Sequence, residues 1–468
     1  MNDDQALELA LKSTQKWLEE LNTSPVCATE TLENLRAKIA VELKQEGVEP
    51  ERVISELVEA TKGGLLGSAG GRFYAWVIGG SLPSALAADW LTSAWDQNSA
   101  LYACSPATSI IEEVAGEWIK ELLDLPRDAS FAFTTGCQLA HFTCLASARV
   151  AVLKKVGWDI NQDGLFNAPH ISIITNENRH LSIDRAVRYL GFGNRSLIPL
   201  ETDENGKVLP KTLEQAIDSC DGNPVIVVLN AADLNTGTFD SFEELIPIAK
   251  SRDAWVHIDG AFGLFARASQ AKYHLTEGLD GADSWATDGH KWLNVPFDCG
   301  IAIVKNREAH REAMTISASY IAPDTNARDQ INWNPEWSRR ARSISIYAAL
   351  RELGKKGVEE LVERCCQYCQ MLVAEIGKLP GVEILWKPQL NQGLIRFKSS
   401  KKSANNADHD FETDKVIAAI NATGEAFFSG TTWRGVRAMR VSVVNWRTSE
   451  DDVLRTITAV EKIVLSRR

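Results

Sequence analysis

The sequence predicts an α/β protein with a mainly parallel sheet and a small α+β domain at its C-terminal end. From about residue 105, helix-like stretches alternate with short β-branched runs, which is the pattern of a parallel sheet with covering helices. After a long helical region, further short runs suit a second, smaller sheet. The runs expected as strands of the main sheet are 171–174, 224–229, 254–258 and 300–304.

The first part of the chain is predicted to be helical. Apolar residues recur at helical spacing over 5–21, for example Leu7, Leu11 and Leu18, and further helical stretches cover 31–45 and 51–61. An amphipathic helix at the start of a chain needs a surface to cover its apolar face. We therefore expect a protruding arm that folds onto a second subunit.

The last third of the chain is predicted to begin with a long helical region, 338–378. The runs 382–385, 394–397 and 439–444 follow as expected strands, and the polar stretch 398–410 as an exposed loop. Three segments are therefore expected along the chain: an N-terminal helical arm and dimerisation segment, a large domain and a small C-terminal domain. Their ranges are 1–104, 105–350 and 351–468.

Composition excludes several classes of protein. The 468 residues carry a net charge of −12, and we find no clusters of Lys and Arg of the kind that bind nucleic acid or an anionic membrane surface. The N-terminus lacks the basic and apolar regions of a signal peptide, and no apolar run reaches the roughly 20 residues that span a bilayer. Nine cysteines, an odd number, suit a reducing cytoplasm. We expect Cys365, Cys366 and Cys369 to be small buried side chains and not metal ligands.

An aspartate and a lysine 32 residues apart, Asp259 and Lys291, indicate a pyridoxal phosphate enzyme. This cofactor needs a lysine amine to hold its aldehyde as a Schiff base and a carboxylate to keep its pyridine nitrogen protonated. Asp259 follows the run 254–258, so it is expected at the carboxyl edge of a sheet, where ligands of open α/β sheets bind. Taken singly, Asp259 is an ordinary turn residue and Lys291 an ordinary solvated side chain.

With these residues placed, the chain resembles the pyridoxal-phosphate-dependent decarboxylases of group II, the aromatic-L-amino-acid and glutamate decarboxylase group. The resemblance spans nearly the whole chain, and the stretches that carry it are 105–112, 180–186, 257–259 and 284–300. The resemblance implies the PLP-dependent transferase fold (fold type I, aspartate aminotransferase-like), with the large domain as the PLP-binding one. It also implies Lys291, His180 and Asp259 as catalytic residues.

The resemblance implies further cofactor contacts in the same stretches. His180 would stack on the cofactor ring, although a histidine at this point also suits a plain helix cap. His290 would reach the phosphate or the substrate carboxylate. Asp288 stands where relatives often carry a phosphate-side asparagine, and Ala261 belongs to the cofactor-binding set.

A phosphate cup is expected at Gly136, Cys137 and Gln138, where a strand-like run gives way to a helical one. Free backbone N–H groups at a helix N-terminus hold an anion. Many relatives read Gly-Gly-Ser-Glu-Ala-Asn where this chain reads Gly-Cys-Gln-Leu-Ala-His at 136–141. Asp233 stands at a threonine-like position near the ring, either to tune the cofactor or to cap a turn.

The type of reaction depends on which residue binds the substrate carboxylate. The bond at the substrate Cα that stands perpendicular to the cofactor ring is the one that breaks, and the bound carboxylate sets which bond that is. Arg440 is the leading candidate, on a strand whose alternation puts it on one face with Ser442; a surface salt bridge is the alternative. Tyr320 lies in a polar loop expected to close over substrate, and Trp76 in a stretch that suits either a pocket or the core. An ungapped alignment puts Gln330 where aromatic decarboxylases carry their proton-donating tyrosine.

The sequence therefore predicts a cytoplasmic homodimer that uses pyridoxal 5′-phosphate to decarboxylate an L-amino acid, aromatic or other, with no metal, nucleic-acid or membrane partner. Transamination and oxidative formation of an aldehyde are alternatives with the same cofactor. A non-catalytic binding protein, or a metal-binding protein that uses His257 and Asp259, is an alternative of another class.

Overall fold

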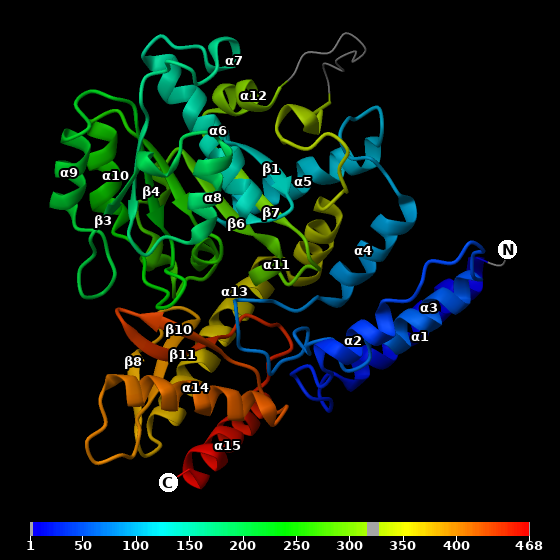
Figure 1. Cartoon of the computed structure of the whole chain (residues 1–468). Helices are drawn as coiled ribbons and strands as arrows, with labels where there is room; N and C mark the ends of the chain where they lie inside the picture. The colour runs from blue at the N-terminus through cyan, green and yellow to red at the C-terminus, as the bar shows by residue number, and fades with distance from the viewer. Residues whose placement is uncertain (1–2, 316–326, 468) are drawn as a thin grey trace. The chain divides into compact units, whose positions relative to one another are not determined.

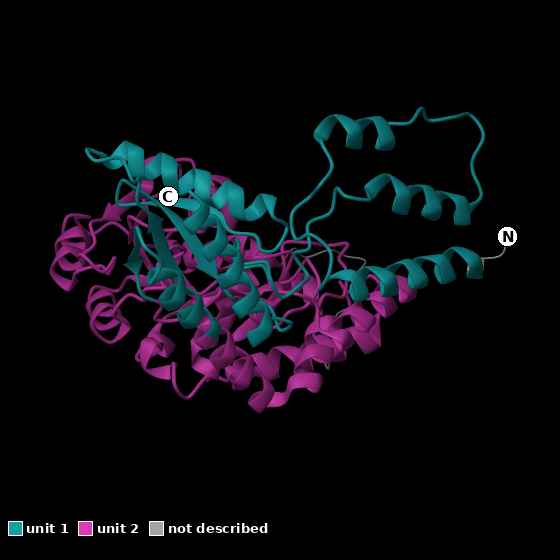
Figure 2. Cartoon of the chain, turned by 90° about the horizontal axis from the view of Figure 1, so that it is seen from below, with its two compact units in different colours: residues 1–78, 368–387, 393–468 teal, residues 79–367, 388–392 magenta. Residues whose placement is uncertain are grey.

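The computed structural model describes residues 3–315 and 327–467 (Figure 1). The chain divides into two units, which Figure 2 shows in teal and magenta. Unit 1 comprises residues 1–78, 368–387 and 393–468, and unit 2 comprises residues 79–367 and 388–392. The three segments expected from the sequence divide the chain into consecutive ranges, unlike these units. They stay a prediction.

Unit 2 is built on a seven-stranded sheet with the order β1-β7-β6-β5-β4-β2-β3. The strands are β1 (Ser130–Thr134), β2 (Ser172–Asn176), β3 (Leu197–Leu200), β4 (Val225–Asn230), β5 (Trp255–Asp259), β6 (Ser284–Asp288) and β7 (Gly300–Val304). Strand β7 runs antiparallel to β1 and β6, and the other pairs are parallel. The four expected runs are confirmed as β2, β4, β5 and β7, and the predicted fold class with them.

The helices of unit 2 follow the strands in alternation, which lets parallel neighbours pair. They are α4 (Pro83–Trp95), α5 (Pro106–Leu122), α6 (Cys137–Lys155), α7 (Ile160–Asp163), α8 (Leu181–Tyr189), α9 (Pro210–Asp218), α10 (Phe242–Ser251), α11 (Gly289–Trp292), α12 (Arg307–Met314) and most of α13 (Ser343–Gly377). Helix α6, cyan in Figure 1, packs on β1, β7, β6, β5 and β4. Its apolar residues join those of the strands in one core, so the first turn of α6 is held rigidly against the sheet.

Side chains cover the outer edge of β1, which lies at one end of the sheet. Arg328 donates to the carbonyl of Phe131. Asn334 Nδ2 and Arg339 Nη2 donate to the carbonyl of Phe133, at 2.6 and 2.8 Å. Guanidinium and amide groups thus satisfy carbonyls that no neighbouring strand reaches.

The Arg339 guanidinium also forms a buried ion pair. Its Nη1 lies 2.8 Å from Oε2 of Glu112 on α5 and donates to the carbonyl of Ser99 at 2.9 Å. Glu112 is 1% exposed. The ion pair therefore joins α5 to the segment that precedes α13, inside the protein.

Unit 1 contains a smaller sheet with the order β10-β11-β9-β8. Its elements are α1 (Asp3–Glu20), α2 (Leu32–Ile39), α3 (Pro50–Thr61), the end of α13, β8 (Val382–Trp386), β9 (Gln392–Phe397), α14 (Asn406–Ala422), β10 (Ser429–Trp433), β11 (Val436–Ser442) and α15 (Glu450–Ser466). This sheet confirms the expected small C-terminal sheet. The helix expected over 31–45 ends earlier, at Ile39.

The loop expected over 398–410 is wrong in its last part, where α14 begins. Asn405 accepts the backbone N–H of Asp408, and the Asp408 carboxylate accepts that of Asn405. Such a reciprocal cap is made of polar residues, so it has the composition of a loop although it starts a helix.

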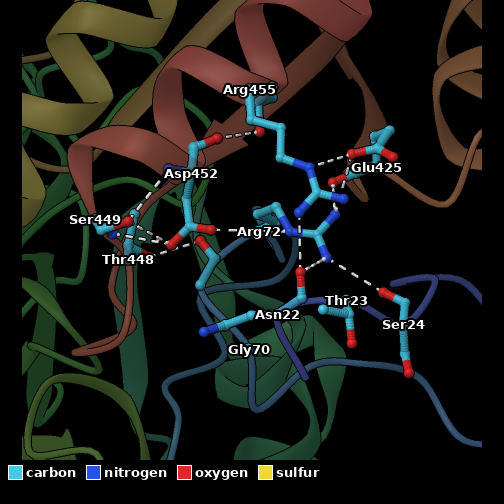
Figure 3. Close-up of polar contacts among 12 residues, drawn as sticks. Asn22, Thr23, Ser24, Gly70, Arg72, Glu425, Thr448, Ser449, Asp452 and Arg455 are labelled. Atoms are coloured by element: carbon cyan, nitrogen blue, oxygen red, sulfur yellow. Dashed lines mark hydrogen bonds and ion pairs between the residues drawn. The ribbon is translucent and has the colours of Figure 1, made fainter. Parts of the chain in front are cut away.

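A buried arginine ties the N-terminal helices of unit 1 to its C-terminal elements (Figure 3). Arg72, only 2% exposed, donates to the carbonyls of Asn22 and Ser24 at 3.1 and 3.2 Å and to that of Glu425. Its Nε lies 3.8 Å from Asp452, in the first turn of α15. Burial lowers the pKa of Arg72, and the carboxylates of Glu425 and Asp452 oppose that effect.

Two expectations about composition can be compared with the described residues. Cys365, Cys366 and Cys369 are buried, as expected, and the nine cysteines, all among the described residues, form no disulfide. Within residues 3–315 and 327–467, the helices are too short or too polar to cross a bilayer.

Candidate active site

Polar residues gather at one edge of the large sheet because strand register aligns their strand ends. Asp259, the last residue of β5, pairs with Asn230, the last residue of β4. Asp288 closes β6 and pairs with Gly300, which also pairs with Thr134 at the end of β1. Since β1, β4, β5 and β6 share one direction, their carboxyl ends form a single edge.

Lys291 lies just beyond this edge in α11, three residues after Asp288. Its Nζ is 3.2 Å from Asp288 Oδ2 and 5.6 Å from the centre of the Phe262 ring. The backbone of α11 is closely packed, since a Cβ added at Gly79 would lie 2.3 Å from the Lys291 carbonyl. The amine therefore projects from a fixed backbone toward a carboxylate.

Asp259 is almost wholly buried, with 7% of its surface exposed. Its Oδ1 accepts the backbone N–H of Ala261 at 3.2 Å and lies 3.5 Å from His141 Nε2. Burial by itself raises the pKa of Asp259, but His141, His180, the Ala261 N–H and Lys291 together outweigh burial, so this pKa lies below its usual value. The site thus holds an ionised carboxylate at the end of β5.

The first turn of α6 reaches the same edge. Gly136 precedes the helix with no side-chain cap, which leaves backbone N–H groups of the first turn for other partners. One of them, from Cys137, donates to Asp288 Oδ1 at 2.7 Å. The Gln138 side chain points elsewhere and donates to the Ser182 carbonyl at 3.3 Å.

Close contact between two glycines sets the position of this turn. A Cβ added at Gly300 on β7 would lie only 2.2 Å from the carbonyl carbon of Gly136. Only a residue without a side chain lets the two backbones approach so closely. The expected phosphate cup therefore sits against the strand that lies between β1 and β6.

His180 caps helix α8. Its Nδ1 accepts the backbone N–H of Ser182 at 3.2 Å and lies 2.7 Å from the Ser182 hydroxyl. The cap that the sequence offered as an alternative role is therefore present. Ring stacking on a cofactor stays a prediction.

Asp233 organises a turn after β4. Its Oδ1 accepts the backbone N–H groups of Asn235 and Thr236 at 2.8 and 2.9 Å and the Thr236 hydroxyl at 3.0 Å. The sequence suggested that Asp233 either tunes the cofactor or caps a turn, and the structure shows Oδ1 capping a turn.

His290 lies between the strand end and a loop. Its Nδ1 accepts the backbone N–H of Cys299 at 3.2 Å, and its Nε2 is 3.6 Å from Asp288 Oδ1. The ring lies 4.4 Å from that of Phe297. Burial lowers the pKa of His290, so the imidazole is neutral at physiological pH.

Two of the three expected substrate residues belong to unit 1, and the third lies outside the described residues. Arg440 is buried on β11 in unit 1, where it pairs with Ser429. Trp76, also in unit 1, is 47% exposed and contacts Phe73 and Phe427. Tyr320 lies outside the described residues.

One residue of the site was not predicted to have a role. His141 stands next to Asp259 and contacts His257 as well, with 2.9 Å between His141 Nδ1 and His257 Nε2. A sequence signal existed, because Cys137 and His141 are four residues apart and share one face of α6. The sequence did not indicate that His141 contacts Asp259 on β5.

Pyridoxal phosphate fits these groups chemically. An amine for its aldehyde, an ionised buried carboxylate for its ring nitrogen and a helix N-terminus for its phosphate all border one edge. The Cys137 N–H is paired with the Asp288 carboxylate, so a phosphate at that N–H would displace or adjoin a like charge.

Comparisons with known proteins agree with this chemistry. The family model described as the pyridoxal-dependent decarboxylase conserved domain matches residues 33–400. An aromatic-L-amino-acid decarboxylase of Bacillus atrophaeus is 26% identical over 453 residues, which are 95% of this chain and 92% of the relative.

Two solved structures are similar over nearly the whole chain. The crystal structure of Oryza sativa TDC with PLP and tryptamine has a TM-score of 0.92 and 19% identity, and covers 100% of this chain and 99% of its own. That of Rhodiola rosea 4-hydroxyphenylacetaldehyde synthase has a TM-score of 0.86 and 21% identity, and covers 98% and 97%. At these identities the likeness shows a shared fold.

Proposed function

Because the chain belongs to the pyridoxal-dependent decarboxylase family, we propose that it removes the α-carboxylate of an L-amino acid as CO2 and releases the amine. The observation that supports this proposal most is the juxtaposition of an amine and two carboxylates at one sheet edge. Lys291 Nζ lies 3.2 Å from Asp288, and Asp259 ends the strand beside it.

Pyridoxal phosphate, when bound, supplies an electron-withdrawing ring that accepts the electron pair left at Cα. In our proposal Lys291 holds the cofactor aldehyde covalently, and Asp259 faces the ring nitrogen and keeps its proton in place. The low pKa of Asp259 supports this role, because an ionised carboxylate stabilises a protonated ring nitrogen.

The remaining groups of the site would bind and orient. The first turn of α6, at Gly136, Cys137 and Gln138, would hold the phosphate with backbone N–H groups, as an uncapped helix N-terminus favours an anion. His180 would cover one face of the ring, and His290 would contact the phosphate or the substrate carboxylate. Asp233, Ala261 and Asp288 complete the proposed cofactor-binding set.

Proposals for the substrate rest on fewer observations. Arg440 would bind the substrate carboxylate, which its burial beside β10 supports, since a buried guanidinium binds a carboxylate strongly. Tyr320 is proposed as a proton donor and Trp76 as part of the substrate pocket.

We also propose that the protein is a cytoplasmic homodimer. Large apolar side chains on α1 and α3 are exposed in the single chain, among them Leu7 at 70% and Leu57 at 55%. A second copy would cover such faces. Light scattering at micromolar concentration tests this: twice the chain mass is expected, and a monomer would contradict it.

Oxidative formation of an aldehyde is a second candidate function. It is favoured by Gln330, which stands where an ungapped alignment with aromatic decarboxylases places their tyrosine, and by the likeness to a 4-hydroxyphenylacetaldehyde synthase. Gln330 is 1% exposed. Transamination is the third outcome that the same cofactor allows.

A panel of aromatic, acidic and diamino L-amino acids separates these functions. Purified protein loaded with cofactor is incubated with each, and CO2, amine, aldehyde and ammonia are measured. CO2 with the matching amine is expected; CO2 with aldehyde and ammonia would indicate the oxidative reaction, and no CO2 from any substrate would overturn the proposal. Lys291→Ala is expected to lose both turnover and the visible absorption of bound cofactor.

A further inference from the structure

A row of buried side chains runs behind Asp259, away from Lys291. Trp255 Nε1 donates to Ser284 Oγ at 3.0 Å, and Ser284 Oγ lies 2.9 Å from His257 Nδ1. His257 Nε2 lies 2.9 Å from His141 Nδ1, and His141 Nε2 lies 3.5 Å from Asp259 Oδ1. The row therefore connects the interior of β5 and β6 to the carboxylate at the site.

The two histidines of this row are neutral. Both rings are 0% exposed. Burial lowers the pKa of His257 to about 3, and it also lowers the pKa of His141, against the pull of Asp259. Each imidazole thus carries one proton, on one of its two nitrogens.

The ends of the row decide where these protons lie. The Asp259 carboxylate at one end can only accept, which places the His141 proton on Nε2, the atom that faces it, and makes His141 Nδ1 an acceptor. His257 then carries its proton on Nε2 and donates to His141 Nδ1. His257 Nδ1 is left as an acceptor for the Ser284 hydroxyl, whose oxygen accepts the Trp255 N–H.

His141 is the residue that links this row to the carboxylate of Asp259. His257 alone, without a ring at 141, would have no acceptor at its Nε2 and no connection to Asp259. The histidine at 141 therefore completes the row.

We propose that His141 is a positioning residue that directs an N–H at Asp259 and thereby holds this carboxylate ionised and oriented toward the ring nitrogen of pyridoxal phosphate. The inference rests on the proposed function, since it assigns a task to Asp259 with the cofactor bound. It adds a supporting row of Ser284, His257 and His141 to that site.

A metal ion is the competing occupant of the same place. Ligand atoms of Cys137, His141 and Asp259 all lie within 4.8 Å of one another, with 3.3 Å between Cys137 Sγ and His141 Nε2. The zinc content of the purified protein, measured below, decides between a metal and the row.

The test uses holoenzyme reconstituted with pyridoxal phosphate labelled with ¹⁵N in its ring, because the nitrogen chemical shift reports protonation directly. In the wild type we expect the ring nitrogen to stay protonated between pH 6 and 9. In His141→Ala we expect it to lose its proton about one pH unit lower than in the wild type, with kcat lowered about tenfold and KM nearly unchanged.

Two further variants keep the proposal falsifiable if His141→Ala folds poorly. His141→Asn restores an N–H donor at this position and should recover most of the wild-type nitrogen titration. His257→Gln should give an intermediate effect. His274→Asn, which replaces an exposed histidine outside the row, is the matched control and should change nothing.

The outcomes separate this inference from the proposed function. An unchanged nitrogen titration in both His141→Ala and His257→Gln would overturn the inference while leaving the enzyme assignment intact. Stoichiometric zinc in the purified protein, lost in His141→Asn, would overturn it in favour of a metal site. A wild type that binds no cofactor would remove both the proposed function and the inference.

Discussion

Oδ1 of Asp288 accepts the backbone N–H of Cys137 at 2.7 Å, so a carboxylate occupies a donor of the proposed phosphate cup. The other oxygen of the same carboxylate lies 3.2 Å from Lys291 Nζ. One side chain thus contacts both the helix N-terminus and the proposed cofactor lysine.

Asp288→Asn is expected to strengthen cofactor binding. The amide oxygen can still accept the Cys137 N–H, but the negative charge that repels the cofactor phosphate is gone. We expect the dissociation constant of pyridoxal phosphate to fall roughly fivefold, equivalent to about 1 kcal/mol. Absorbance titration of apoprotein measures it. Asp128→Asn, at an exposed site, controls for net charge, and weaker binding by Asp288→Asn would contradict the expectation.

Gly300→Ala is expected to damage both stability and cofactor binding. The new Cβ would lie 2.2 Å from Gly136, and rigid backbone must shift to admit it. We expect a cost of roughly 2 kcal/mol, a Tm lower by about 4 °C and a cofactor dissociation constant raised about tenfold. Gly47→Ala is the control, because nothing lies within 4 Å of its added Cβ. An unchanged Tm in Gly300→Ala would show that the contact yields easily.

Arg339→Met is expected to destabilise unit 2 by about 3 to 5 kcal/mol, because it leaves the Glu112 carboxylate buried without the guanidinium 2.8 Å away. Urea unfolding followed by tryptophan fluorescence measures the loss. The double variant Glu112→Gln with Arg339→Met should be less destabilised than Arg339→Met alone, since the buried charge of Glu112 is gone and Arg328, 3.8 Å from Glu112, keeps the Glu113 carboxylate nearby. If the double variant is the less stable one, the ion pair is not the source of the effect.

His310 should make the fold sensitive to acid. It is 0% exposed, its Nε2 lies 2.8 Å from the Trp333 carbonyl and its Nδ1 2.8 Å from Ser130 Oγ. Burial lowers its pKa from 6.5 to about 3. Below pH 6.5 His310 therefore binds a proton in the unfolded chain but stays neutral in the folded chain. The stability present above pH 6.5 is lost progressively as the pH falls toward 3.

His310→Gln removes that dependence while its amide can satisfy the same two partners. Over this pH range the free energy of unfolding of the variant should fall less steeply than that of the wild type, by about 1.4 kcal/mol per pH unit. Urea titrations at several pH values measure both slopes. His274→Gln, at an exposed site, should keep the wild-type slope, and equal slopes for wild type and His310→Gln would refute the assignment.

The main strands and the site edge were predictable because their signal is local. A run such as 254–258 is apolar and β-branched, and an aspartate directly after it falls at the carboxyl edge of any parallel sheet. Strand β6, Ser284–Asp288, is as fully buried but contains Ser, Thr and Asp, so its composition did not indicate a strand. Its burial comes from neighbours on both sides in the sheet.

The row behind Asp259 was not predictable for a similar reason. His141 and Asp259 are 118 residues apart, and their contact depends on how α6 lies across β5. Likewise, the role of Asp288 as an acceptor for the Cys137 N–H requires the register of β1, β7 and β6 to be known. The periodicity of apolar residues predicts the helices and strands, whereas such side-chain pairs depend on how those helices and strands pack together.

The covered edge of β1 has a consequence for the growing polypeptide. The side chains that cap the Phe131 and Phe133 carbonyls come from Arg328 and Arg339, 197 and 206 positions further along. At about 5 to 20 residues per second, a ribosome needs roughly 10 to 40 seconds to synthesise that interval. For most of that interval β1 also lacks its antiparallel partner β7, which ends at Val304, and its outer edge stays without the last of these caps until translation passes residue 339.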